Sequence, residues 1–247
     1  NPSKTNASVR RGDADYYFKK AIGWSQVGNA QKTFRSVENS VCGTATPTIY
    51  LKDTKLYNYV LAFLNTKIAY EYLVAYNPTI NLLTTDICNL PLIIREELIC
   101  KLDAMVNECI EFEKVDWDSF ETSWDFQRHP LLRKVSTISE AFEQWQNECD
   151  SRFNQLKSNE EELNRIFIDI YGLQDELTPE IEDKDVTVRK ADLGRDIRSF
   201  ISYAVGCMFG RYSLDEEGLI YAGGDFDDKF RLRDGQWEIK TKEGWKK

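Results

Sequence analysis

The sequence has 247 residues, of which 42% are hydrophobic and 13% aromatic, enough for one large or two ordinary folded domains. No apolar run approaches the roughly 20 residues that a bilayer requires, and no signal peptide is evident, so we expect a cytoplasmic protein without a membrane partner. A single histidine and six cysteines without CxxC spacing argue against zinc sites and most histidine-dependent hydrolases, and no metal is expected. Because the sequence does not begin with Met, we expect an internal piece of a longer protein.

The formal net charge of −9 is unevenly distributed along the chain. Residues 1–67 carry ten basic and four acidic side chains, a balance of +6, whereas residues 68–247 carry 22 basic and 37 acidic ones, a balance of −15. A basic segment in an acidic protein is the electrostatic footprint of a surface that contacts DNA phosphates. Ordinary charge fluctuation over a window of this length is the alternative.

The basic segment is expected to contain two short strands, at 16–24 and 32–37, joined by a Gly/Asn turn. Lys19 and Lys20 suit phosphate contacts there, whereas Arg35 suits a bidentate pair with guanine. The other candidate DNA contacts in this segment are Trp24, Ser25, Gln26, Asn29 and Gln31, with Gln26 suited to adenine. A twisted sheet with a solvated polar face is the alternative to a DNA contact.

The stretch 43–92 is expected to form a strand, two helices and a closing apolar strand. Asp53 is a candidate cap for the first helix, and the residue before Pro78 ends the second, because helical geometry is disfavoured there. Asn65 and Lys67 lie at the break between the helices. They are candidate phosphate contacts, although polar groups at helix junctions more commonly satisfy exposed backbone groups.

Two long helices are expected next, with apolar stripes at 98–112 and from Thr137 to Ile170. Thr137 and Glu140 have capping-box spacing, and the matching stripes predict an antiparallel pair. The loop between the helices should pack onto the fold, because it carries four aromatic residues, Trp117, Phe120, Trp124 and Phe126.

An acidic hinge at 175–185 precedes a third expected helix at 192–209, with Gly210 suited to its C-cap. Asp234-Gly235 predicts a type I′ hairpin in which Leu232 faces Trp237 and Arg231 faces Glu238. The six cysteines are expected to be reduced core residues, and His129 is expected in a loop rather than in catalysis.

Several segments have a family resemblance. The strings are LNTK (64–67), NPTIN (77–81), DICNLPL (86–92), DWDSFETSWDFQRHPLL (116–132) and ISYAVGCMFGRYSLDEEGLIYAGG (201–224). They resemble the target-recognition and spacer region of the PglX family, the adenine-specific DNA methyltransferases of BREX type 1 phage-defence systems, and of related type IIG restriction-modification proteins. The last two strings are the more specific ones.

The resemblance implies a parent protein that uses S-adenosylmethionine to methylate an adenine in double-stranded DNA, with other defence-system proteins as further partners. This part of the family selects the DNA sequence. The family's Asn/Asp-Pro-Pro-Tyr/Phe motif is missing, because Asn77-Pro78 lacks the second proline and the aromatic residue. The family's Gly-rich cofactor loop is missing as well. We therefore expect no catalytic residue, no cofactor-binding residue and no cofactor in this chain.

The sequence as a whole predicts an α+β fold with three parts: a target-recognition module at 1–92, a helical spacer at 93–180, and a C-terminal helix with a β-hairpin at 181–247. Two alternatives to DNA recognition are a protein–protein scaffold with acidic helices and an acidic decoy that mimics DNA. A scaffold would show no salt-dependent DNA binding, and the basic segment argues against a decoy.

Overall fold

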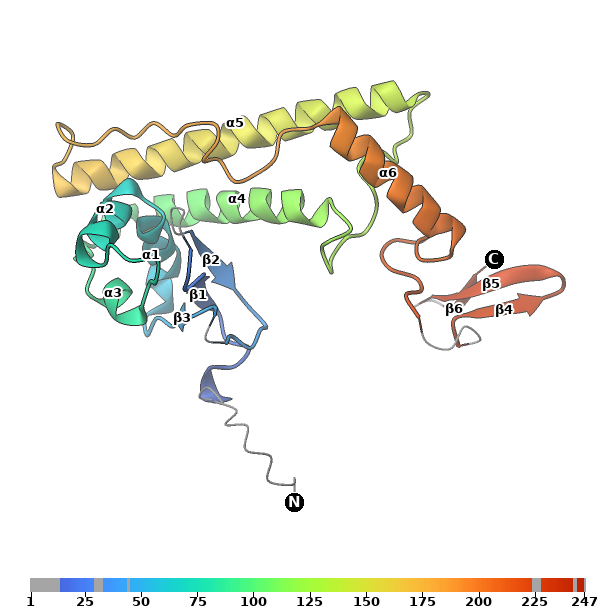
Figure 1. Ribbon diagram of the computed structural model, residues 1–247, viewed down its shortest axis with the longest axis horizontal. Coiled ribbons are helices and arrows are strands. Elements are labelled where there is room, and N and C mark those ends of the chain that lie inside the picture. The colour runs from blue at the N-terminus through green and yellow to red at the C-terminus, as the bar shows by residue number, and fades with distance from the viewer. Residues whose placement is uncertain (1–13, 29–32, 44, 224–227, 242–243, 247) are drawn as a thin grey trace, which may run out of the picture. The chain divides into compact units, whose positions relative to one another are not determined.

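The computed structural model describes residues 14–28, 33–43, 45–223, 228–241 and 244–246 (Figure 1). Within them lie six α-helices and two three-stranded antiparallel sheets, which confirms the α+β prediction. The helices are α1 (Tyr57–Leu64), α2 (Lys67–Tyr76), α3 (Thr84–Cys88), α4 (Ile99–Asp118), α5 (Ile138–Tyr171) and α6 (Leu193–Met208). The strands are β1 (Ala21–Trp24), β2 (Phe34–Val37), β3 (Thr48–Ile49), β4 (Phe230–Arg233), β5 (Gln236–Thr241) and β6 (Gly244–Lys246). None of the described helices is both long and apolar enough to cross a membrane.

The chain divides into two compact units. Unit 1 comprises Asn1–Phe112 and Asn154–Thr187, and unit 2 comprises Glu113–Phe153 and Val188–Lys247. Helices α4 and α5 each contribute residues to both units. The three-part division into 1–92, 93–180 and 181–247 stays a prediction.

The sheet of unit 1 has the order β2-β1-β3, so β1 is the central strand. All of β1 is buried, and its partners are Trp24 with Phe34, Gly23 with Arg35, and Ala21 with Val37. The strand is shorter than predicted. It begins only at Ala21, after Phe18, whose φ of 62° interrupts an extended backbone.

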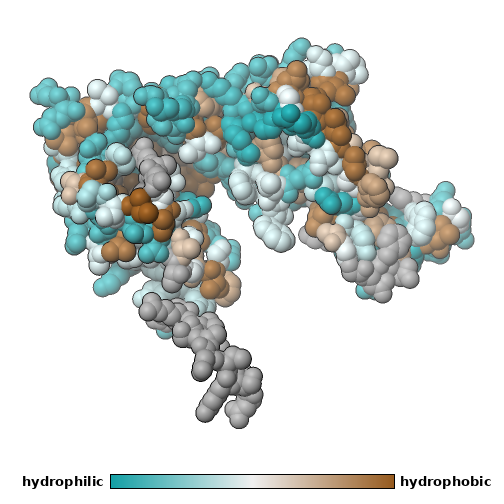
Figure 2. Space-filling view, viewed as in Figure 1, coloured by the Kyte–Doolittle hydropathy of each residue, from teal (hydrophilic) through white to brown (hydrophobic). Residues whose placement is uncertain are grey.

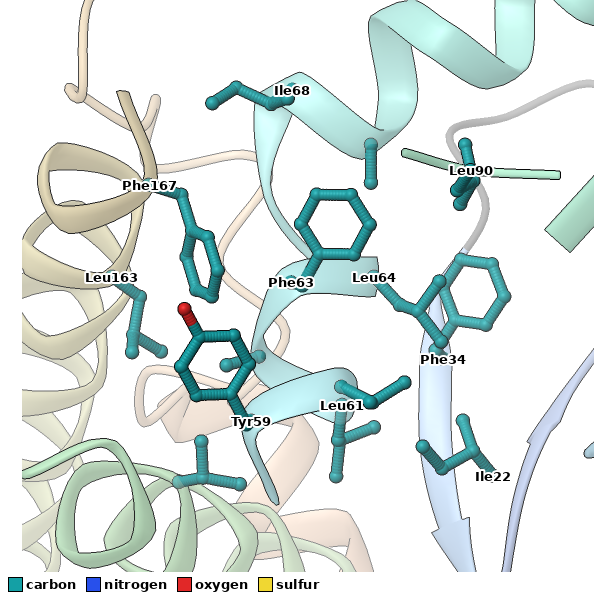
Figure 3. Close-up of a cluster of buried hydrophobic side chains, with 14 of the residues drawn as sticks. Ile22, Phe34, Tyr59, Leu61, Phe63, Leu64, Ile68, Leu90, Leu163 and Phe167 are labelled. Carbon is teal, nitrogen blue, oxygen red and sulfur yellow. The ribbon is translucent and has the colours of Figure 1, made fainter. Parts of the chain in front are cut away.

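Helix α1 is buried over its whole length and lies between the sheet and α5 (Figure 3). On one side, Tyr59 and Phe63 pack on Phe167 of α5. The centroid of the Phe167 ring lies 5.4 Å from that of Tyr59 and 5.6 Å from that of Phe63. On the other side, Leu64 faces Phe34 of β2 (Figure 3). The core of the predicted recognition module is therefore completed by residues from α4 and α5.

The predicted helix break and the stop at Asn77-Pro78 are confirmed, because α1 ends at Leu64 and α2 ends at Tyr76. Asp53 caps the start of this helical segment, as predicted. It accepts a hydrogen bond from Lys55 N in the short 3-10 helix Thr54–Leu56, which runs directly into α1. One detail is wrong. The expected closing strand is helix α3, whose start is stabilised by Asp86 Oδ2 accepting from Leu83 N at 2.9 Å.

The two predicted long helices are α4 and α5, and they run antiparallel within unit 1. Lys101 pairs with Glu162 at 2.8 Å, and Glu108 accepts a hydrogen bond from Asn159 at 2.7 Å, so residue numbers fall along α5 as they rise along α4. At the start of α5, Thr137 accepts from Glu140 N at 3.2 Å, as the capping spacing predicted.

In unit 2, the predicted third helix is α6, capped by Asp192 and followed by Gly210 with φ 74°. The aromatic loop packs only in part: Phe126 is buried against Tyr203, whereas Trp124 is 99% exposed. The hairpin has the predicted register, with Leu232 opposite Trp237, and positive φ at both Asp234 and Gly235 as a type I′ turn requires.

The cysteines are free, as predicted, but they are not all core residues. Only Cys149 is buried, and burial raises the pKa of its thiol to about 12. Cys88 and Cys100 are exposed on helices whose apolar positions point elsewhere, so apolar neighbours in the sequence were a poor guide to burial.

Truncation of Phe167 should destabilise unit 1. Because its ring is fully buried between Tyr59 and Phe63, Phe167→Ala should lower the free energy of unfolding by about 3–5 kcal/mol in urea denaturation. Trp124→Ala is the matched control, since that indole is 99% exposed and its loss should cost little. Equal losses in the two variants would contradict this account of the core.

His129 should make unit 2 sensitive to acid. Burial lowers the pKa of this imidazole to about 4, and its Nδ1 accepts from Leu131 N, so the folded state holds it neutral. A folded pKa below the unfolded value of about 6.5 gives stability that is present above pH 6.5 and lost as the pH falls towards 4. Between pH 7 and pH 5 the protein should lose about 2 kcal/mol more stability than His129→Gln, measured by urea denaturation. The same pH dependence in both proteins would rule this out.

Candidate nucleic-acid interface

Arg35 and Ser25 are joined on the outward side of the unit 1 sheet. Arg35 Nη2 donates to Ser25 Oγ at 3.0 Å, and both residues are exposed. The Cα partner of Arg35 is Gly23, where an added Cβ would lie only 2.9 Å from Val37 Cγ2. Close packing against Val37 therefore favours glycine at position 23, directly opposite Arg35.

Gln26 follows Ser25, and its backbone is bonded on both sides. Its N–H donates to Ala45 O at 3.2 Å, and its carbonyl accepts from Leu82 N at 2.8 Å. These two hydrogen bonds fix the position of the Gln26 backbone, from which the partly exposed side chain extends. The turn residues Asn29 and Gln31 lie outside the described residues.

Lys19 and Lys20 are exposed immediately before β1. Lys19 Nζ lies 5.6 Å from the centre of the Tyr16 ring, and Lys20 Nζ lies 4.4 Å from that of Tyr57. Lys20 also pairs with Glu38 at 3.1 Å. Exposed pairs of this kind contribute only about 0–1 kcal/mol, so a phosphate can replace Glu38.

Trp24 has a structural role. Its side chain is 0% exposed, and its Nε1 donates to Leu82 O at 3.1 Å. Because β1 is the central strand, a ligand cannot reach this indole without opening the core. The candidate DNA contact Trp24 is therefore a core residue.

Asn65 also has a structural role, at the free edge of β2. Its Oδ1 accepts from Phe34 N and its Nδ2 donates to Phe34 O, both at 3.0 Å, which reproduces the pairing that a neighbouring strand would give. The second Nδ2 hydrogen goes to Leu61 O at 3.0 Å. Asn65 therefore closes the sheet edge next to Arg35 while ending α1.

Lys67 is engaged by the acidic segment 175–185. Its Nζ donates to Glu180 O at 2.6 Å, and its backbone N–H donates to Asn164 Oδ1 at 2.9 Å. The structure thus separates the eight candidates that lie among the described residues into two groups. Lys19, Lys20, Ser25, Gln26 and Arg35 can reach a ligand, whereas Trp24, Asn65 and Lys67 hold the fold together.

The chain has relatives of known name. No family model matches it. Over 217 residues, 85% of this chain, it is 45% identical to the adenine-specific methyltransferase PglX of Lacticaseibacillus casei (strain Zhang), of which it covers 18%. Over 238 residues, 89% of this chain, it is 29% identical to the adenine-specific methyltransferase BrxX of Escherichia coli O9:H4 (strain HS), of which it covers 19%.

The chain is homologous to one segment of these methyltransferases. The resemblance to the PglX family that the sequence strings indicated is confirmed. The chain spans less than a fifth of the length of PglX or BrxX, so their names describe proteins much larger than the segment shared with it.

The side-chain amide of Asn77 is fully engaged within the fold. Asn77 Nδ2 donates to Asn81 O at 2.8 Å and to Asp86 Oδ2 at 2.7 Å, while Oδ1 accepts from Thr79 N at 3.1 Å. The amide is used up in ending α2 and starting α3. Among the described residues, no group of His, Cys, Asp and Glu could hold a metal ion.

Asn65→Ala should damage the sheet rather than remove a ligand contact. The unpaired Phe34 N–H and C=O should cost about 1–3 kcal/mol of stability, and hydrogen exchange at the Phe34 amide should accelerate. Asn154→Ala, an exposed change in α5, is the control and should do neither. Unchanged exchange at Phe34 in the Asn65 variant would contradict the edge-closing role.

Proposed function

We propose that the chain is a DNA-sequence-recognition part of an adenine-specific DNA methyltransferase of a BREX or restriction–modification phage-defence system. The homology to PglX and BrxX supports the methyltransferase context. In this proposal the parent protein uses S-adenosylmethionine and methylates adenine in double-stranded DNA, in the cytoplasm and alongside other defence-system proteins. This chain contributes binding and selection, and its engaged Asn77 amide does not fit the flipped base.

The observation that carries the recognition role is the pairing of Arg35. By comparison, the four arginines Arg133, Arg189, Arg195 and Arg231 each bond to a carboxylate, which offsets their charge. Arg35 instead bonds to the neutral hydroxyl of Ser25, with one Nη group. Its charge and its other N–H groups suit a bidentate pair with guanine N7 and O6, while Ser25 orients the guanidinium.

The neighbouring side chains suit complementary roles. Lys19 and Lys20 provide cations for phosphates on the approach to β1, and Gln26 provides an amide for adenine, from a backbone fixed on both sides. Phosphate contacts position DNA without reading it, so the two kinds of residue should differ in what their loss does.

Arg35 should therefore be tested with a charge-retaining variant. In a full-length relative carrying the aligned arginine, Arg35→Ala should relax the choice at one base of the methylated motif by roughly 1–3 kcal/mol, read by sequencing of methylated DNA. Arg35→Lys should retain DNA affinity but lose most of that choice, because lysine lacks the bidentate fork.

Binding by the chain itself provides the controls. Fluorescence anisotropy with duplex DNA should show affinity that falls with salt, and Lys19→Ala should weaken binding to all sequences and flatten the salt dependence. Lys101→Ala, which removes an exposed cation of α4, should have little effect. An unchanged motif in Arg35→Ala would end the base-reading proposal, and absence of salt-dependent binding would favour the scaffold alternative.

A further inference from the structure

Helix α6 has an exposed apolar face. Ile201 is 57% exposed, Met208 82% and Phe209, at the helix end, 81%, and the other members of the face are Leu193 and Val205. Figure 2 shows hydrophobic side chains following α6 on the visible surface. Contiguous exposed apolar surface of this kind marks interaction sites, since isolated exposed residues would not line up along one helix.

The face is one side of an amphipathic helix. Ile201 and Val205 are four residues apart, Met208 and Phe209 follow Val205 by three and four residues, and Leu193 precedes Ile201 by eight. Their side chains therefore project in one general direction. The opposite side is occupied by the buried residues Asp196, Tyr203 and Gly206. A Cβ added at Gly206 would lie 2.7 Å from the Tyr212 ring, so that side of α6 already has a tightly packed partner within unit 2.

Two exposed arginines border the part of the face from Ile201 to Phe209, although the chain is acidic. Arg198 is exposed on the helix, and Arg211 is exposed just beyond its end. Residues 192–211 are all described, and their carboxylates are Asp192, exposed at the N-cap beside Leu193, and Asp196. Asp196 is 2% exposed and bonded to Trp145 Nε1 at 3.0 Å and to Arg195 Nε at 2.7 Å, so it does not offset the two exposed arginines at the surface.

We propose that the α6 face binds an amphipathic helix of a partner protein, one whose apolar stripe is flanked by acidic residues. Apolar side chains at helical spacing supply the contact area, and Arg198 and Arg211 select the acidic flanks. The face is in unit 2 and shares no residue with the candidate DNA contacts, so the proposal does not rest on the proposed function.

Two other occupants fit the charges less well. A second copy of α6 would bring the same basic face with it, and Arg198 would find no acidic counterpart. Anionic lipid surfaces are typically bound by clusters of about four to eight Lys/Arg, whereas this face carries two exposed arginines on a chain of net charge −9.

The test uses two designed helical peptides with the same leucine stripe, one flanked by Glu and the other by Lys, each carrying a fluorophore. In anisotropy titrations the Glu peptide should bind the intact chain at least tenfold more tightly than the Lys peptide. Ile201→Ser should weaken the Glu peptide at least tenfold, and Arg198→Glu should abolish or reverse the preference between the peptides. Leu232→Ser, at an equally exposed apolar position of β4, is the control and should leave binding unchanged.

Four outcomes would overturn the proposal. They are equal binding of both peptides, no binding of the Glu peptide, a dimer in sedimentation that Ile201→Ser dissociates, and binding to phosphatidylglycerol vesicles that Ile201→Ser removes. Circular dichroism of each variant checks the fold. Because Ile201 is 57% exposed, its replacement by serine should leave the spectrum unchanged.

Discussion

The packing of α1 between the sheet and α5 is the contact on which the candidate interface depends. Tyr59 and Phe63 fill the space beside Phe167, and Leu64 faces Phe34 on the other side (Figure 3). The strand that presents Arg35 is only four residues long, and a small sheet has little stability of its own. The position of the strand therefore comes from α1, and that of α1 comes from Phe167 of α5, which lies 104 residues after Phe63 in the sequence.

Local signals in the sequence predicted much of the fold. The Asn77-Pro78 stop, the Thr137 cap and the Asp234-Gly235 turn act through neighbouring backbone, so their effect survives in the folded chain. The prediction of a closing apolar strand in the stretch 43–92 was wrong, because a short apolar run does not distinguish a strand from a helix. Here Asp86 stabilises the start of helix α3 by accepting a hydrogen bond from Leu83 N. Trp124 and Phe126, two residues apart in one loop, differ completely in burial, and composition cannot separate them.

The candidate site was less predictable than the fold. Arg35 is exposed next to the buried Phe34, as strand alternation predicts, whereas Ser25 lies just after the fully buried β1. Their mutual hydrogen bond requires knowledge of the register between β1 and β2. Trp24, Asn65 and Lys67 carry the chemistry expected of DNA contacts, yet each uses its polar groups on backbone carbonyls or amides far away in the sequence. The sequence feature that could have drawn attention to Arg35 is Gly23, an interior strand glycine directly opposite.

Trp24 stabilises the sheet from its buried side, through its hydrogen bond to Leu82. Asn65 stabilises the sheet from its edge, through its hydrogen bonds to Phe34. The residues exposed on the other side are therefore not needed to hold the strands in place. We therefore expect that exchanging Ser25, Gln26 and Arg35 for other polar residues has little effect on the core, so that folding and the proposed ligand contact depend on different side chains. Under the proposed function, a lineage with this arrangement can change what it recognises by few substitutions, and the scaffold that positions them does not have to be rebuilt each time.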